Sequence, residues 1–528
     1  MKTKKKGFSL EMIREKTEKR LTGENGKKRG NGALWTAAAQ TLFGLCMAGI
    51  IADIIFNNQT AYYEYTPAAM LLCGGASMAV WLAAWKAWDR VIGTLGVRTE
   101  RRVVALGMVL YFFVQVVVGL MLQVNATQTW DFGIVFDAAR QQAESGIVPG
   151  EYFQRFGNNA PLYLVLCGWF ELLHALGIQD VMPLSVVMNA ALIHVSVWGV
   201  YAAARRLSGQ KTALFAWGVS MLFPVFLLYA PIVYTDTVSM PFVIWGAVAW
   251  LKLREREFNK KTVILTILFA VCIAVGTWIK LTVIIVGIAA LADAACNHAI
   301  PFQAKKALIA AVAFAGVFTA LNTATAQSGR LPQPDRNEQI PKLHWVMMGL
   351  NGTGGYNDDD YQLTLTGKTY DEKLQIVQKE IIRRLEQGGI SGMFSHLADK
   401  LSFTFGDGLF MAPVKLDIGP VHLGNPLQSY CIQGMQHTGR TMYFGLSVHL
   451  ILLIGMALGA YDAVKRQKMN PAVLQIAVLG LIVFLMIWET RSRYLVNFLP
   501  LMAVLGVQEY ERFTRPKPKA AADSTQEV

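Results

Sequence analysis

Long apolar stretches separated by short polar segments dominate this chain of 528 residues. Most of the stretches approach the twenty or so residues that a helix needs to cross roughly 30 Å of hydrocarbon. Helices also satisfy their own backbone hydrogen bonds there. The pattern predicts an all-α polytopic membrane protein with about 12–13 apolar helices. The apolar runs lie at 33–56, 66–88, 103–124, 161–177, 181–204, 212–231, 237–253, 262–279, 281–296, 307–325, 441–463, 471–488 and 493–510.

The basic residues predict the orientation of these helices. They give a net charge of +13, but they occur in short clusters between apolar runs and not on one polar domain, which argues against a nucleic-acid partner. Cytoplasmic loops carry an excess of Lys and Arg. We therefore expect a multi-pass protein of the cell membrane with both termini in the cytoplasm. The clusters centre on Arg101, Arg205, Arg254, Lys305, Arg466 and Arg515.

This orientation divides the chain into segments. The run at 161–177 contains Glu171 and His174, and only one net crossing fits between 161 and 204, so we expect 161–177 not to cross fully. The predicted segments are a basic cytoplasmic tail at 1–32, two transmembrane helices at 33–102, a transmembrane core at 103–325 with a first outer loop at 125–160, an extracytoplasmic loop domain at 326–440, C-terminal transmembrane helices at 441–510 and a tail at 511–528.

The loop domain itself shows helical patterns. Apolar residues recur at helical spacing over 371–387, and Gly388 and Gly389 follow as a stop signal. The stretch 392–405 places Phe394, Leu397, Leu401 and Phe405 on one side. We expect short interfacial helices here, the second of them lying on the membrane surface.

Acids and hydrogen-bond donors follow the third apolar run. Asp131 comes just after a membrane exit, where partial burial would raise the pKa of a general base and keep it near its substrate. A solvated helix cap is the alternative. Asp137 follows at a spacing compatible with a short interfacial helix. The loop ends with donors that suit a phosphate or a sugar, namely Arg155, Asn158 and Asn159.

Ionisable residues also interrupt later apolar runs. Asp236 and Lys280 are each embedded between two such runs, which is costly unless they function or form a structural Asp–Lys pair. The turn before the last run carries Glu489, Arg491 and Arg493. Arginines on the outer side run against the orientation rule, so this turn predicts an anionic partner.

A glycine-rich segment at 344–360 includes Asn351, a further candidate binding residue, and ends in three consecutive acids. It has neither Walker spacing nor a strand followed by GxGxxG, so no nucleotide site is predicted. Three adjacent acids leave room for a divalent cation, although they lack the alternation of a calcium loop and equally fit a solvated loop. The metal requirement therefore stays open.

Together these motifs resemble the GT-C superfamily of membrane glycosyltransferases, which includes protein O-mannosyltransferases and the bacterial aminoarabinose transferase. The resemblance spans about 110–500 and rests on the order of WDFGIVFDAA, YFQRFGNNAP, YTD, GTWIKLT and ETRSRYLVNFLP. The chain departs from the O-mannosyltransferase pattern of Asp-Glu because Phe132 follows Asp131. Its GLNGTGGYNDDD segment is similar to Gram-positive bacterial members, whose substrates do not transfer to this chain.

The resemblance implies a GT-C-like fold and a polyprenyl-phosphate sugar donor. It implies an extracytoplasmic active site in which Asp131 acts on the acceptor while Arg155, Lys280, Arg491 and Arg493 stabilise the leaving phosphate. The acceptor would be a glycan, lipid or protein of the cell envelope, and direct displacement would invert the anomeric centre. A transporter or flippase for a lipid-linked saccharide is the alternative, and a noncatalytic membrane scaffold is a third.

Overall fold

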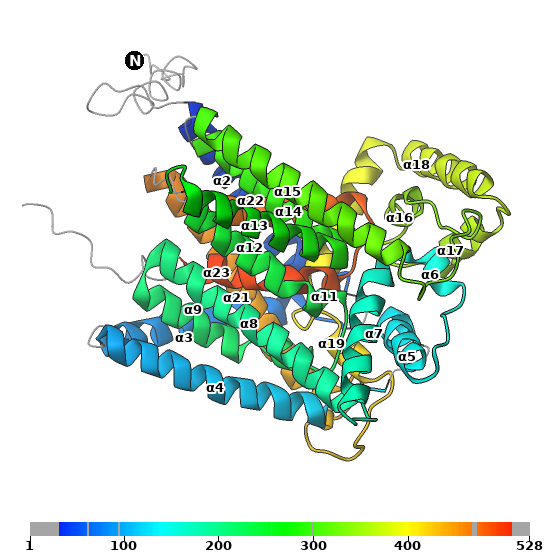
Figure 1. Cartoon of the computed structure of the whole chain (residues 1–528). Helices are drawn as coiled ribbons and strands as arrows, with labels where there is room; N and C mark the ends of the chain where they lie inside the picture. The colour runs from blue at the N-terminus through cyan, green and yellow to red at the C-terminus, as the bar shows by residue number, and fades with distance from the viewer. Residues whose placement is uncertain are drawn as a thin grey trace, which may run out of the picture.

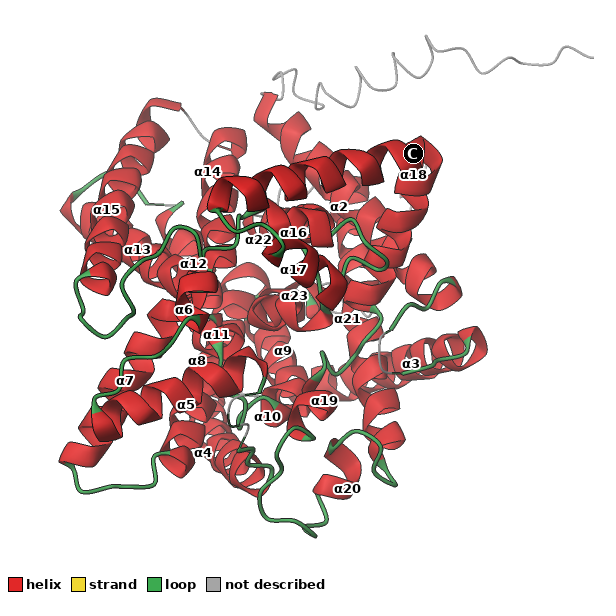
Figure 2. Ribbon diagram, turned by 90° about the vertical axis from the view of Figure 1, so that its right-hand side faces the viewer, coloured by secondary structure: helices red, strands yellow, loops and turns green. Residues whose placement is uncertain are grey.

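The computed structural model describes residues 31–508 except 61–62, 93–95, 126, 128, 255, 298–299 and 467–471. Almost all of the predicted tail at 1–32 and the whole tail at 511–528 lie outside the described residues. Within the described ranges the regular structure is helical, apart from one isolated antiparallel bridge between Val124 and Pro420. Figures 1 and 2 show the helices as one bundle with smaller helices across one end.

The helices run in the following order. The first half contains α2 (Asn31–Phe56), α3 (Pro67–Ile92), α4 (Val97–Met121), α5 (Trp130–Ser145), α6 (Tyr152–Arg155), η1 (Gly157–Asn159), α7 (Ala160–Ala175), α8 (Met182–Ser208), α9 (Gln210–Leu222), α10 (Val225–Leu228), α11 (Thr235–Val238), α12 (Met240–Leu253) and α13 (Lys260–Ile279). The second half contains η2 (Leu281–Val283), α14 (Ile284–Asn297), α15 (Ile300–Ala326), α16 (Leu343–Met348), α17 (Asp358–Leu365), α18 (Tyr370–Phe405), α19 (Ala412–Leu416), α20 (Gln428–Cys431), α21 (Thr438–Arg466), α22 (Val473–Ile487), η3 (Ser492–Phe498) and α23 (Leu499–Val507).

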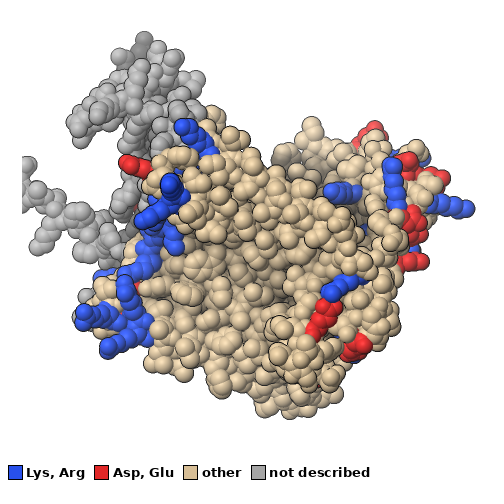
Figure 3. Space-filling view, viewed as in Figure 1, with Lys and Arg blue, Asp and Glu red and all other residues tan. Residues whose placement is uncertain are grey.

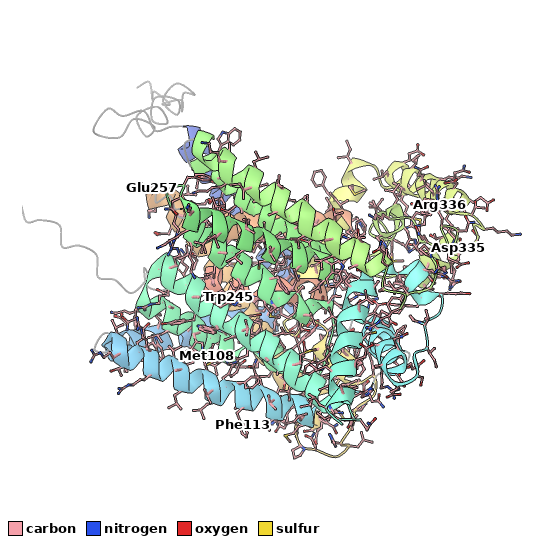
Figure 4. The ribbon with its side chains drawn as sticks, in the orientation of Figure 1. Met108, Phe113, Trp245, Glu257, Asp335 and Arg336 are labelled. Atoms are coloured by element: carbon pink, nitrogen blue, oxygen red, sulfur yellow. The ribbon has the colours of Figure 1, made fainter. Side chains whose placement is uncertain are left out.

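Seven helices of the described residues are long and apolar enough to cross a membrane. Several expose large apolar side chains to the surroundings, such as Leu72 on α3 and Phe113 on α4, which Figure 4 labels at the edge of the bundle. Such faces suit lipid and not water. The predicted all-α polytopic membrane class is confirmed. The seven helices are α2, α3, α4, α8, α13, α15 and α21.

Four predicted spans are not continuous helices, and this corrects the sequence analysis. The run at 212–231 breaks at Pro224 into α9 and α10, and α12 begins only at Met240, after Asp236 and the short α11. The runs at 281–296 and 493–510 each begin with a 3₁₀ turn. At Pro224 the helix ends because proline has no backbone N–H to donate. At the other breaks, buried polar residues lie in the turns. Such breaks are tolerated at membrane depth where protein buries them.

The apolar run at 161–177 forms α7, which starts with Pro161 in its first turn and has 16 residues. That length falls short of the roughly twenty residues of a full crossing. It packs against α5, and both lie at the same end of the bundle as α6 (Figure 1).

The long loop at 326–440 folds as helices that lie across this end of the bundle (Figure 2). Thr369 and Glu372 form a capping box at the start of α18, and Gly389 kinks it with φ 53°, close to the predicted glycine stop. The predicted membrane-facing side of 392–405 is wrong at Phe405, which is 1% exposed. Leu401 packs against the core as well.

Charge separates along the bundle axis. Figure 3 shows Lys and Arg at the left-hand end, acids mixed with Lys and Arg at the right-hand end, and a wide uncharged band between them. Glu257, in the α12–α13 connection, marks the left-hand end, and Asp335 and Arg336 mark the other (Figure 4). The uncharged band is the part of the surface that a bilayer would cover.

Candidate functional site

The breaks in the helices bring charged groups together. Asp236, in α11, is fully buried and forms ion pairs with Lys280, with Arg493 at 3.3 Å and with Lys415 at 3.9 Å. Lys280 caps the end of α13, Arg493 lies in η3 and Lys415 lies in α19. Each cation therefore comes from a break or a short helix and not from the middle of a long one. The Asp236–Lys280 pair occurs as the structural alternative predicted, but two further cations join it.

The cations shape the ionisation of the cluster. Burial disfavours the charged form of Asp236, but the ion pairs with Lys280, Arg493 and Lys415 stabilise its carboxylate. Burial, together with the charge of Arg493, lowers the pKa of Lys415 to about 7. The Lys415 ammonium lies over the rings of Phe132, Tyr229 and Tyr234 at 5.3–5.7 Å, which stabilises its charged form.

Arg493 links this buried cluster to Asp131, whose carboxylate lies 3.6 Å from the guanidinium. The Asp131 side chain is 40% exposed. Tyr152 donates a hydrogen bond to it at 2.8 Å, and Asn159 in turn donates to the Tyr152 oxygen at 2.7 Å. Tyr234 donates to Asn159 at 3.0 Å. This series of hydrogen bonds fixes Asp131 beside the cations, while part of its side chain stays exposed.

Arg491 lies at the rim of the same site. Its guanidinium stacks on the rings of Trp130 and Tyr356 at 5.5 and 5.6 Å and lies 3.6 Å from Glu489. Glu489 is buried and also accepts a hydrogen bond from Tyr494. Trp130 has φ 49°, a costly conformation for a residue with a side chain, and such strain clusters at functional sites.

The glycine-rich segment supports the site through packing. Thr490 donates its backbone N–H to the carbonyl of Gly354 at 2.8 Å. A Cβ on Gly354 would come within 2.7 Å of the Lys400 side chain, and one on Gly355 within 2.9 Å of Phe403. These glycines therefore allow the segment to lie directly on α18 and on the turn that carries Arg491.

A second tight loop positions Lys415. Asp407 accepts backbone hydrogen bonds from Leu409 at 2.9 Å and Met411 at 2.6 Å, and one from the Ser492 hydroxyl at 2.9 Å. Phe410 and Met411 both have positive φ angles, 54° and 63°. The buried Asp407 thus holds a strained turn that starts α19 and ties it to η3.

Seven of the predicted site residues meet here, and four lie elsewhere. Asp137 pairs with Arg140 at 2.5 Å, and both line a separate pocket. Arg155 forms ion pairs with Glu151 at 2.9 Å and Glu338 at 3.0 Å, which neutralise its charge. Asn158 donates to the neighbouring Asn159, and Asn351 donates to Asp360. The seven residues that meet are Asp131, Asn159, Asp236, Lys280, Glu489, Arg491 and Arg493.

Sequence reasoning missed Lys415, Tyr152 and Asp407. Lys415 follows the apolar stretch Leu409–Val414, so the argument used for Lys280 would have found it. Its position within a long polar loop concealed this signal. Tyr152 and Asp407 gave no comparable signal, because their roles depend on partners far away in the sequence.

The three consecutive acids form the first turn of α17, and Asn357 caps that helix. Asp360 is buried and pairs with Arg384 at 2.5 Å. Across the described ranges no three His, Cys, Asp or Glu side chains lie close enough to hold a metal ion. The role proposed for these acids as cation ligands gains no support from their surroundings.

Several solved structures are similar to this chain. Solved structures similar to this chain include the archaeal oligosaccharyltransferase AglB from Archaeoglobus fulgidus in complex with an inhibitory peptide and a dolichol-phosphate, at 12% identity and a TM-score of 0.41 over 77% of this chain and 50% of that one. The apo form of the A. fulgidus oligosaccharyltransferase gives 12% identity and 0.42 over 76% and 49%. The chain thus spans about half the length of these proteins.

At 12% identity and TM-scores of 0.41 and 0.42, these structures give no information about the chemistry of this chain. No curated protein matches. A family model described as conserved hypothetical integral membrane protein matches residues 38–513, which is most of the chain. The chain belongs to this family of integral membrane proteins.

Proposed function

We propose that this protein is a membrane glycosyltransferase that moves a sugar from a polyprenyl-phosphate donor to an acceptor of the cell envelope. The observation that carries the proposal is the charge balance of the site. Lys280, Lys415 and Arg493 converge on Asp236, and Arg493 also reaches Asp131. Arg491 pairs with Glu489 at the rim, so four cations face three carboxylates. A site with surplus positive charge that opens beside an exposed acid suits an anionic leaving group next to a base.

The proposed reaction is a direct displacement at the anomeric carbon. The acceptor hydroxyl forms a bond to that carbon, and its proton passes to Asp131. The bond from the anomeric carbon to the phosphate oxygen breaks, and its electron pair leaves with the polyprenyl phosphate. Arg491, Arg493 and Lys280 stabilise the phosphate in a partly buried site, where such interactions are stronger than in water. One displacement inverts the sugar configuration.

The proposal requires the site to face away from the cytoplasm, because the basic loops lie at the opposite end. Gln339 and Asp359 are exposed residues of the loop domain, whose Asp335 and Arg336 mark the site end in Figure 4, and the exposed Glu257 marks the other end. We expect Gln339→Cys and Asp359→Cys to react with a membrane-impermeant maleimide in intact cells. Glu257→Cys, the matched control, should react only after permeabilisation. The reverse pattern would place the site in the cytoplasm and remove the proposed donor geometry.

Arg491→Lys tests the phosphate site. The planar guanidinium stacks on Trp130 and Tyr356, and an ammonium keeps the charge but loses the stacking and the paired donors. We expect transfer to need more lipid donor, with a raised apparent KM. Arg336→Lys, at an exposed surface arginine that also contacts an aromatic ring, is the control. An unchanged donor dependence would leave Arg491 as a structural residue.

Donor affinity should depend on pH through Lys415. Its pKa is about 7, lowered by burial, so the side chain gains a positive charge as the pH falls through 7. Below that pH the site is more cationic, and we expect a phosphate donor to bind more tightly. Lys415→Met should flatten this dependence between about pH 6 and 8. Binding of a polyprenyl phosphate measured across this range checks it, and a full dependence in the variant would assign the effect elsewhere.

A further inference from the structure

Large apolar side chains crowd the kink of α18, away from the candidate site. Ile382 and Leu385 precede the kink and are 56% and 46% exposed, while Ile390 and Phe394 follow it and are 83% and 72% exposed. We call residues 382–394 the elbow. Isolated apolar residues are common on water-exposed surfaces, but a group this dense marks a contact with lipid or another protein.

The backbone conformation of the kink explains why residue 389 is a glycine. Gly389 has φ 53°, and a Cβ added to it would meet nothing within 4 Å, so packing does not require a glycine. A positive φ does require one, because other residues avoid this conformation. The kink brings apolar residues from both halves of α18 to one exposed bend, outside the protein core.

The second half of α18 is anchored where a transmembrane helix ends. Asn57, just after α2, donates a hydrogen bond to Asp399 at 2.9 Å, and Gln59 donates its backbone N–H to Ser402 at 3.0 Å. Phe56, the last residue of that span, is 73% exposed. At 1.5 Å per helical residue, Phe394 lies about 8 Å and Ile390 about 14 Å along the helix from Asp399.

Ile390 and Phe394 thus lie within about 14 Å of helix length from the residue that is bonded to the end of α2. Figure 2 shows α18 lying across the end of the bundle and not along its axis. The exposed Ile390 and Phe394 therefore belong to the helix that is bonded to the end of α2, a membrane-spanning helix whose last residue, Phe56, is itself exposed. This attachment favours lipid over a protein partner as the contact.

The elbow contains three charged residues, Arg383, Arg384 and Glu386, and both arginines are paired with acids of the protein. Arg383 pairs with Glu380, and Arg384 pairs with Glu380 and Asp360. They leave no block of like charge that would select an anionic headgroup or an oppositely charged partner. The contact surface is defined by its apolar side chains.

We propose that the elbow inserts its apolar side chains into the lipid surface beside the outer end of α2, as a monotopic contact in addition to the transmembrane helices. The contact fixes the height of α18 above the bilayer. Lys400, which follows the elbow on α18, donates to the carbonyls of Gly349 and Met486, so the height of α18 also affects the position of the glycine-rich segment beside Arg491. The inference does not depend on the chemistry proposed for the site.

Photo-crosslinking in native membranes tests the insertion. The photoreactive residue p-benzoylphenylalanine replaces Ile390 in one full-length variant and Phe394 in another, and Asp371, which is exposed at the far end of α18, in the control. After irradiation, mass spectrometry of the purified protein identifies what each position has captured. We expect phospholipid adducts at 390 and 394, many times more abundant than at 371.

Two results would overturn the proposal. Crosslinked dimers at both positions without lipid adducts would show that a second copy covers the elbow. Lipid adducts at 390 and 394 no more abundant than at 371 would place the elbow in water. Both substitutions lie at exposed positions, so neither variant should be lost to misfolding, and each checks the other.

Discussion

Asp131→Asn is expected to reduce sugar transfer by about a hundredfold or more, the range for removing a general base. Asparagine keeps the size of the side chain and can still accept the hydrogen bond from Tyr152, but it cannot take a proton. The variant should insert in the membrane and still bind the lipid donor, because the cations that face the phosphate remain. Transfer rate and donor binding are measured separately on the same preparation.

Asp371→Asn is the matched control, because this acid is 73% exposed and pairs with the surface residue Arg336, away from the site. It should transfer at the wild-type rate. A well-folded Asp131→Asn protein that also transfers at that rate would remove Asp131 as the base. Asp236 and Glu489, the other acids of the site, would then be the residues to replace next.

Asp236→Asn is expected to destabilise the protein by about 3–5 kcal/mol, the usual cost of breaking a buried ion pair by removing one partner. The substitution leaves Lys280, Lys415 and Arg493 facing one another without the buried carboxylate. Thermal unfolding in detergent measures the effect as a large drop in Tm. The loss should be partly reversed by Lys280→Met, because that change removes one uncompensated charge.

Asp137→Asn provides the comparison, because Asp137 is equally an acid of low exposure but pairs with a single arginine that is 39% exposed. Its loss of stability should be clearly smaller. Equal losses in the two variants would mean that the cations around Asp236 do not depend on it. The site would then lack the charge coupling on which the proposal rests.

The sequence predicted the membrane class and much of the site for one physical reason. A charge inside an apolar run is costly enough to be noticed, which singled out Asp236, Lys280 and the arginines near 491. The same cost predicted the Asp236–Lys280 pair as an alternative. Burying Lys415 is costly for the same reason, but Lys415 lies within a long polar loop, where the sequence pattern does not distinguish a buried lysine from an exposed one.

Pairing between distant residues could not be predicted in the same way. Arg155 and Arg493 were equal candidates for holding a phosphate, yet Glu338 neutralises Arg155 from 183 residues away, while Arg493 is shared between Asp131 and Asp236. Glu151, four residues before Arg155, also pairs with it, and the sequence analysis did not consider this neighbour.

The broken helices were missed for a related reason. Apolar composition continues through Pro224 and on either side of Asp236 and Lys280, so hydropathy alone merged each turn with the helices beside it. What ends these helices is the local chemistry of proline and the hydrogen bonding of buried polar side chains. The turns that resulted are those that carry the site.

Release of polyprenyl phosphate by the purified protein in proteoliposomes is the most direct test of the proposed activity. The vesicles contain a panel of polyprenyl-phosphate sugars and an envelope extract as the source of acceptor. We predict that free polyprenyl phosphate appears together with a glycosylated product for at least one donor, and that Asp131→Asn reduces both by about a hundredfold or more. Movement of the intact donor between leaflets without release of the phosphate, unaffected by Asp131→Asn, would contradict the transferase and indicate a transporter of the lipid-linked sugar.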